Sequence, residues 1–274
     1  MSGQVVYKMT GSGNDFVFVD GRFTRPVDWS EERIRAVCDR RTGVGADGLV
    51  VVEPGTGPAA VRMTYFNRDG SPAPMCGNAA LCATRFAAQR ELAPGEGMEL
   101  ETEAGIYRTR CLSGQEPLAE LDLGDISQSS KAQVALVPGE SAARLATVGV
   151  PHLVVVVEDV GEVNVLERGR LLRHDPALGP KGANVNFVSH GATGWEMRTY
   201  ERGVEGETLA CGTGAVATAA VLRDLGSADV PWSVRTASGC TLVVKGCAEA
   251  DGLRRVQLVG EGRLVFRAVL GELR

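Results

Sequence analysis

One long sequence motif occurs twice in this chain. Residues 62–88 read RMTYFNRDGSPAPMCGNAALCATRFAA, and residues 196–222 read EMRTYERGVEGETLACGTGAVATAAVL. Each copy begins with a strand pattern, passes through a turn-rich linker, reaches Cys-Gly and continues as an alanine-rich helical run. The two cysteines, Cys76 and Cys211, lie 135 positions apart in a chain of 274 residues. Such a spacing indicates that the chain is built from two similar halves.

The repeat extends upstream of both cysteines. GADGLVVV from Gly45 resembles GANVNFV from Gly182, and GNDFVFV from Gly13 lies opposite VPHLVVVV from Val150. The three matches keep the same order at offsets of 134 to 137 positions, which chance does not readily explain.

Short strand patterns bounded by Gly, Pro, Asn or Asp are common, for example over residues 118–123 and 254–259. Four helices are predicted, over residues 30–40, 77–91, 166–174 and 212–225. Many strands with one long helix per half favour an α+β fold of two pseudo-symmetric lobes, each a sheet or barrel wrapped around a central helix. The predicted lobes are residues 1–120, to which residues 262–274 return, and residues 121–261. We expect the active site in the cleft between them.

Composition narrows the class of protein. Hydrophobic residues make up 44% and charged residues 23% of the chain, as in ordinary globular proteins. The net charge of −5 and the lack of a basic stripe argue against a nucleic-acid partner. The first residues, MSGQVVYK, lack the features of a signal peptide, and no apolar run approaches the ~18 residues that cross a bilayer. We therefore expect a cytoplasmic protein without a membrane partner.

Seven cysteines are widely spread, so they do not form a disulfide framework. The spacings C-x5-C (Cys76, Cys82) and C-x6-C (Cys240, Cys247) suit zinc poorly, and the sequence has only three histidines. The lone Gly-Ser-Gly at residues 11–13 is too weak for a phosphate loop. We expect no metal and no cofactor. Five cysteines have no partner in the repeat and are expected to be structural: Cys38, Cys82, Cys111, Cys240 and Cys247.

Both repeated cysteines precede a predicted helix. A helix start presents unpaired N–H groups and the positive end of the helix dipole, which favours a reactive thiolate and can hold a carboxylate. Two such thiols on opposite faces of an α-carbon could remove and return its proton, inverting the centre. The alternative is that each Cys-Gly only caps its helix with a small buried residue. Its occurrence in both halves favours the catalytic interpretation of Cys76 and Cys211.

These motifs resemble the diaminopimelate epimerase family, pyridoxal-independent epimerases of two pseudo-symmetric α/β lobes. The resemblance runs through most of the chain. It rests on GNDF from Gly13, TGVGADG from Thr42, NRDGS from Asn67, MCGN from Met75, GVPH from Gly149, NVNFV from Asn184, YERG from Tyr200 and ACGTGA from Ala210.

The resemblance implies a role for each matching residue. Cys76 and Cys211 are the acid/base pair, and His152 and Glu201 lie beside the thiols, orienting the substrate amino group or shuttling protons. The backbone N–H groups that hold the α-carboxylate belong to Gly77, Asn78, Gly212 and Thr213. The residues that bind the rest of the substrate are Asn14, Asn67, Asn184 and Arg202. Arg202 grips a distal carboxylate as a fork, and the alternative for it is a surface ion pair.

The implied activity is epimerisation of LL- to meso-diaminopimelate in lysine and peptidoglycan biosynthesis, by a homodimer acting on a small-molecule amino acid. Three positions depart from the family pattern: Val150 replaces an Asn that contacts the distal end of the substrate, and Ala79 and Leu81 replace a Gly and an Arg. Two alternatives therefore stay open. One is a racemase of another amino acid, such as histidine, and the other is a non-catalytic amino-acid-binding relative.

Overall fold

The computed structural model describes residues 3–57, 60–115, 117–192, 194–227 and 231–273. Its contacts divide the chain into two compact units. Unit 1 comprises the chain up to Asp122 and from Val259 onward, and unit 2 comprises Leu123–Leu258. Within the described residues, no helix combines the length and apolar character that a bilayer crossing needs.

Unit 1 holds two α-helices, α1 (Glu31–Cys38) and α2 (Gly77–Gln89). Its strands are β1 (Val5–Gly11), β2 (Asn14–Asp20), β3 (Gly48–Pro54), β4 (Ala60–Asn67), β5 (Pro72–Ala73), β6 (Met98–Thr102), β7 (Gly105–Cys111) and β18 (Arg263–Val269). Two further strands, β8 (Leu118–Ser127) and β17 (Gly252–Glu261), contribute residues to both units. A 3-10 turn (Pro26–Asp28) precedes α1.

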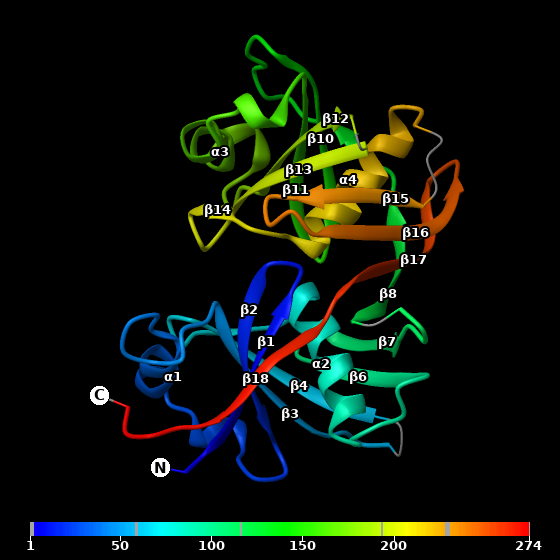
Figure 1. The fold of residues 1–274 in the computed structure, drawn as a ribbon. Coiled ribbons are helices and arrows are strands. Elements are labelled where there is room, and N and C mark those ends of the chain that lie inside the picture. Colours follow the sequence, from blue (N-terminus) through cyan, green and yellow to red (C-terminus); the bar gives the residue numbers. More distant parts are fainter. Residues whose placement is uncertain (1–2, 58–59, 116, 193, 228–230, 274) are drawn as a thin grey trace. The chain divides into compact units, whose positions relative to one another are not determined.

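The strands of unit 1 form one mixed sheet in the order β18-β1-β2-β3-β4-β6-β7-β8. The pairs β2–β3 and β4–β6 are parallel and the others antiparallel. Helix α2 is buried from Gly77 to Ala87 and contacts strands from both ends of the sheet. Figure 1 shows the strands of this unit lying around α2. Small alanine side chains allow strands to pack on every side of the helix.

Unit 2 holds α3 (Val165–Arg173) and α4 (Gly212–Asp224). Its strands are β9 (Ser130–Lys131), β10 (Glu140–Val148), β11 (Val150–Val157), β12 (Asn184–Gly191), β13 (Gly194–Glu201), β14 (Gly206–Thr208), β15 (Trp232–Thr236) and β16 (Thr241–Glu249). Short 3-10 turns cover Val160–Glu162 and Pro176–Leu178. The sheet order is β9-β10-β11-β12-β13-β15-β16, with β11–β12 and β13–β15 parallel.

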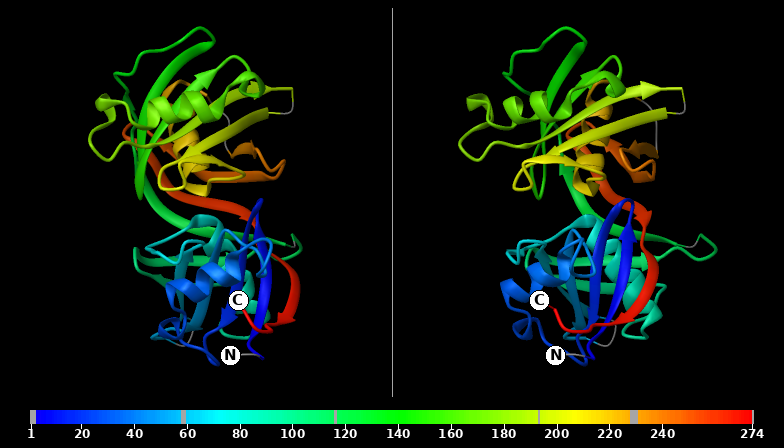
Figure 2. Two further views of the ribbon diagram at one scale, coloured as in Figure 1. Left: turned by 90° about the vertical axis from the view of Figure 1, so that its left-hand side faces the viewer. Right: turned by 60° about the vertical axis from the view of Figure 1, so that its left-hand side comes forward.

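The two units repeat the same pairing pattern, strand for strand. In each, two antiparallel strands lead into a parallel pair, an antiparallel pair, a second parallel pair and a last antiparallel pair. A buried helix, α2 or α4, sits in the same place in both sequences of elements. Figure 2 shows α4 among the strands of its own unit. The predicted α+β fold with one central helix per lobe is confirmed, and all four predicted helices form within a few residues of their expected bounds.

The ladders align the two units residue by residue. The cross-strand row Val17–Leu49–Phe66 in unit 1 has its counterpart in Leu153–Val185–Tyr200 in unit 2. Phe16 is therefore the counterpart of His152, and Asn14 that of Val150. The sequence matches that set Gly13 against Val150 and Gly45 against Gly182 are therefore both one residue out of register.

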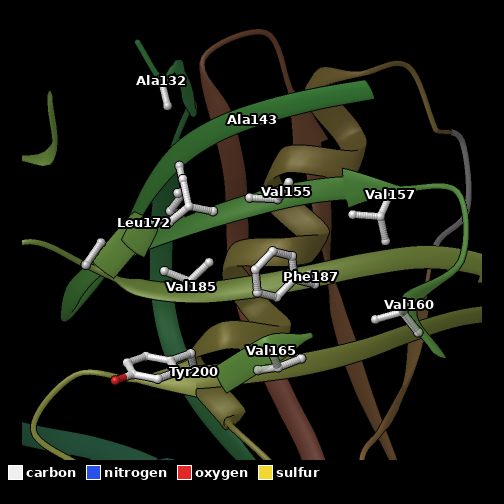
Figure 3. Close-up of a cluster of buried hydrophobic side chains, with 12 residues drawn as sticks. Ala132, Ala143, Val155, Val157, Val160, Val165, Leu172, Val185, Phe187 and Tyr200 are labelled. Carbon is white, nitrogen blue, oxygen red and sulfur yellow. The ribbon is translucent and has the colours of Figure 1, made fainter. Parts of the chain in front are cut away.

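A hydrophobic cluster covers the face of the unit 2 sheet turned away from α4 (Figure 3). Leu153, Val155, Val185, Phe187 and Tyr200 point to this face, where α3 adds Val165 and Leu172. Because strand side chains alternate between faces, the residues next to them point toward α4. This alternation decides which polar side chains reach the start of α4.

Candidate active site

Cys76 and Cys211 are the N-cap residues of α2 and α4, as the sequence predicts. Their backbones match closely, with φ/ψ of −136°/123° and −137°/107°. Each cysteine carbonyl accepts the first helical hydrogen bond, from Ala80 N at 2.9 Å and from Ala215 N at 3.0 Å. The repeat therefore presents the two thiols in the same local geometry.

The first turn of each helix is suited to bind an anion. The leading N–H groups, of Gly77 and Asn78 in α2 and of Gly212 and Thr213 in α4, have no acceptor within their own helix. Neither first turn carries an acidic residue that would neutralise the helix dipole. Gly77, Asn78 and Gly212 are buried, and Thr213 is partly exposed. Each helix start can thus share in holding a carboxylate.

The remaining cysteines differ from this pair. Burial raises the pKa of Cys38 to about 12 and that of Cys82 well above its ordinary value, so both stay protonated. Cys111 and Cys240 are partly exposed. Cys247 is exposed and accepts a hydrogen bond from the Arg255 guanidinium at 3.1 Å.

In unit 1 a chain of hydrogen bonds ends at the start of α2. Asn14 Nδ2 donates to Asp47 Oδ2 at 3.0 Å, and Asn14 Oδ1 accepts from Asn78 Nδ2 at 2.6 Å. Because a carboxylate only accepts, Asp47 fixes the orientation of the Asn14 amide, which in turn fixes that of Asn78. Asn78 Oδ1 is left buried with no partner among the described residues. This chain of hydrogen bonds therefore leaves one buried acceptor, Asn78 Oδ1, at the start of α2 without a partner among the described residues.

Asn67 ends β4 and begins the turn that leads to Cys76. Its Nδ2 donates to Ser71 Oγ at 3.1 Å and its backbone N–H to the Ser71 carbonyl at 2.9 Å. The neighbouring positions on this face of the sheet hold aromatic side chains or a glycine. Phe16 packs edge-on against Tyr65 at 6.0 Å, and a Cβ on Gly48 would meet the Tyr65 ring at 2.6 Å.

In unit 2 the α4-facing side of the sheet carries a group of polar residues. The polar residues that alternate with the hydrophobic cluster are His152 on β11, Asn184 and Asn186 on β12, and Thr199 and Glu201 on β13. Glu201 is half-buried at the end of its strand. These side chains lie in the places that Phe16, Gly48 and their neighbours occupy in unit 1.

His152 is fully buried, with 0% exposure. Its Nδ1 lies 3.2 Å from Asn186 Nδ2, whereas its Nε2 is buried and has no partner among the described residues. Burial, reinforced by the positive charge of Arg202, lowers the His152 pKa from 6.5 to about 3. The imidazole is therefore neutral at physiological pH.

Arg202 and Asn184 are joined through the backbone. Asn184 Oδ1 accepts from the Arg202 N–H at 2.8 Å, which fixes the turn that follows β13. The Arg202 guanidinium contacts the Gly182 carbonyl at 3.5 Å and has no carboxylate partner within the described parts of the chain. The expected grip of Arg202 on a distal carboxylate and the alternative of a surface ion pair both stay predictions.

Comparison with known proteins identifies the family. A family model for diaminopimelate epimerase matches residues 6–127 and 144–264. The chain belongs to the diaminopimelate epimerase family. The diaminopimelate epimerase of Gemmatimonas aurantiaca is 47% identical over 276 residues, covering 97% of this chain and 99% of that protein. That of Aquifex aeolicus is 39% identical over 277 residues, covering 97% of each.

Solved structures agree on the fold of this epimerase-family chain. A PhzF-family phenazine biosynthesis protein from Bacillus anthracis superimposes with a TM-score of 0.76 at 15% identity, covering 98% of this chain and 99% of that one. A hydroxyproline epimerase from Agrobacterium vitis, with bound trans-4-hydroxy-L-proline, superimposes with a TM-score of 0.68 at 18% identity, covering 99% and 93%. At these identities the likeness concerns the fold alone.

The positions that depart from the family pattern have different surroundings. Leu81 and Ala79 are fully buried in α2 and belong to its packing. Val150 is partly exposed at the start of β11, where unit 1 has Asn14. Sequence reasoning missed Asn186, although the pattern Asn-Val-Asn at residues 184–186 places both amides on one face of a strand. It also missed Asp47 as the anchor of the chain of hydrogen bonds through Asn14.

Proposed function

We propose that this protein interconverts LL- and meso-diaminopimelate by moving the α-proton between the thiols of Cys76 and Cys211, without a cofactor. Membership of the diaminopimelate epimerase family makes the chain an amino-acid isomerase, and the reaction feeds lysine and peptidoglycan synthesis. The observation that carries the mechanism is the matched N-cap geometry of the two cysteines.

The proton transfer balances within the two thiols. One thiolate takes the α-proton and becomes a thiol, and the electron pair of the broken C–H bond delocalises into the substrate carboxylate. The other thiol returns a proton to the opposite face and becomes the thiolate. The mechanism requires both sulfur atoms to reach one α-carbon, and the product is the inverted centre.

The helix starts stabilise the charge that develops in this reaction. Gly77, Asn78, Gly212 and Thr213 contribute backbone N–H groups that hold the α-carboxylate, where negative charge grows as the C–H bond breaks. The absence of acidic residues from both first turns keeps these groups available. Stabilisation of the developing carbanion thus needs no cofactor in this proposal.

Polar side chains bind the remainder of the substrate. The buried acceptor on Asn78 Oδ1 suits a donor such as the substrate ammonium group. Arg202 has no carboxylate partner among the described residues and suits the distal carboxylate as a bidentate fork. Asn14, Asn67, Asn184, His152 and Glu201 complete the proposed binding and catalytic set.

One observation favours a second candidate. Val150 stands where the family has an Asn that contacts the distal end of the substrate, so this end of the site is less polar. A site that lacks such an amide discriminates less strongly for a polar side chain. The second candidate is therefore a racemase of a less polar amino acid that uses the same thiol pair.

The test is incubation with a panel of amino acids in deuterated water, following α-deuterium incorporation and chirality. Rapid exchange of diaminopimelate alone supports the proposal. Exchange confined to another amino acid would identify that amino acid as the substrate in place of diaminopimelate. If no amino acid of the panel exchanged its α-proton, the proposed catalytic role of the two thiols would be wrong.

We further propose that the protein works in the cytoplasm as a homodimer. No disulfide joins any of the seven cysteines, all of which lie in the described parts of the chain, and this suits a reducing compartment. The dimer follows the resemblance to two-lobed relatives. Light scattering at assay concentrations tests it, and a monomeric mass would contradict it.

A further inference from the structure

The two nitrogen atoms of His152 have very different surroundings. Nδ1 lies 3.2 Å from the Asn186 side-chain amide, whereas Nε2 has no hydrogen-bond partner among the described residues although it is buried. Buried polar atoms in native proteins are rarely left without a partner, so Nε2 is a place where a ligand atom is expected. What Nε2 offers that ligand depends on which nitrogen carries the proton.

The neighbours of Asn186 fix the orientation of its amide. One amide atom lies 3.3 Å from the Leu153 backbone carbonyl, which can only accept, so that atom is Nδ2. The other atom accepts from Thr199 Oγ1 at 3.0 Å and is therefore Oδ1. The reversed amide would set its oxygen against the Leu153 oxygen.

Packing holds this amide at the start of α4. A Cβ on Gly214 would lie 2.4 Å from Asn186 Oδ1 and 3.2 Å from Cys211 Cβ. Because Gly214 has no side chain, the Asn186 amide fits against the backbone of the first turn of α4. Asn186 is fully buried and cannot turn without displacing these neighbours.

We propose that Asn186 is a positioning residue that holds His152 as the neutral Nε2–H tautomer, so that His152 donates a hydrogen bond to the reacting groups and does not accept a proton from them. Nδ2 of Asn186 is a donor, and the Nδ1 that faces it must accept. The proton of a neutral imidazole then lies on Nε2. The tautomer is a property of the free protein, while its use in catalysis rests on the function proposed above.

The consequence concerns the partner of His152. An Nε2–H group bonds a carboxylate oxygen or a thiolate sulfur, but it cannot hold an ammonium group, which has only donors. The burial that lowers the His152 pKa to about 3 keeps a second proton off the ring. His152 thus differs from the amino-group ligand or proton shuttle expected from the resemblance, and it stabilises negative charge.

Nitrogen NMR of the free protein tests the tautomer directly. The protein has three histidines, so a His152→Gln variant assigns the signal of His152. Long-range proton–nitrogen correlation at pH 7 is expected to show a protonated Nε2 and an unprotonated Nδ1. A protonated Nδ1, or an imidazolium, would overturn the proposal whatever substrate the enzyme takes.

The variant Asn186→Asp reverses the bond, because a carboxylate accepts where the amide donates. We expect the proton to move to Nδ1 and kcat to fall on the order of 100-fold, with KM changing far less. Ser189→Ala is the matched control. Ser189 is buried on the same strand, points to the other face and accepts from Val160 N at 3.0 Å. It should lose stability without a change of tautomer.

An Asn186→Asp protein with unchanged kcat would contradict the positioning role. If that variant does not fold, the tautomer of the wild-type protein still decides the proposal. A missing activity on diaminopimelate would leave the tautomer measurement unaffected, so the two failures are distinguishable.

Discussion

Replacing Gly214 by alanine should lower the free energy of unfolding of the protein, although alanine is the better helix former. In an ordinary helix interior this change gains about 1 kcal/mol. Here the new Cβ would lie 2.4 Å from Asn186 Oδ1, so the amide must retreat by roughly 1 Å to reach an ordinary contact. The counterpart in α2, Ala79, is already alanine.

The retreat of the amide disturbs two hydrogen bonds. Thr199 donates to Asn186 Oδ1 at 3.0 Å, and Asn186 Nδ2 faces His152 Nδ1 at 3.2 Å. A buried polar group left without its partner costs about 1–3 kcal/mol. We expect the two weakened bonds together to cost about 2–3 kcal/mol, so the net loss after the helix-propensity gain is about 1–2 kcal/mol.

Urea denaturation followed by tryptophan fluorescence measures this loss, because Trp195 and Trp232 both lie in unit 2. A double-mutant cycle with Asn186→Ala supplies the control. Once the amide is gone, Gly214→Ala should stabilise the protein by about 1 kcal/mol. If Gly214→Ala stabilised the protein in the wild-type background, the Asn186 amide would not restrict this position.

Four further predictions concern the site. Cys76→Ala and Cys211→Ala should each abolish racemisation in a chirality assay, and near-normal turnover in either would end the two-thiol mechanism. The low pKa of His152 predicts that this residue leaves the free energy of unfolding unchanged above pH 6.5. As the pH falls from 6.5 to about 3, only the unfolded state takes up the imidazole proton, so the free energy of unfolding decreases. Urea midpoints across this range should fall less steeply in His152→Gln. Arg202→Lys should raise KM at least about tenfold for a dicarboxylic substrate and leave exchange of a monocarboxylic amino acid unchanged, as initial rates would show. Val150→Asn should lower KM for diaminopimelate, and a raised KM would count against it as the substrate.

Local signals allowed the helix starts to be predicted from the sequence. Cys-Gly followed by an alanine run marks the beginning of α2 and α4, and both begin at the expected glycine, Gly77 or Gly212. Such signals depend only on residues within one turn. The repeat then supplied the equivalence of the two lobes, which no single helix reveals.

The environment of the side chains could not be predicted in the same way. The local sequence Val-Pro-His does not show whether the histidine is buried, and in the structure His152 has no exposed surface. Its burial depends on which face of β11 meets α4. The bond between Asn14 and Asn78 joins residues 64 positions apart, and Asp47 enters only because β2 and β3 are adjacent. Long-range contacts of this kind leave no periodic signal in the sequence.

Equivalent positions in the two units hold Phe16 and His152, and this difference has a consequence for how such enzymes diversify. An ancestral pair of identical halves would have carried the same residue at both places, together with two identical thiols. The present chain retains the thiols on matched helix starts and varies the strands beside them. Under the proposed mechanism, substrate selectivity can therefore change through substitutions in the strands of one half, while the two thiols and the chemistry proposed for them stay the same.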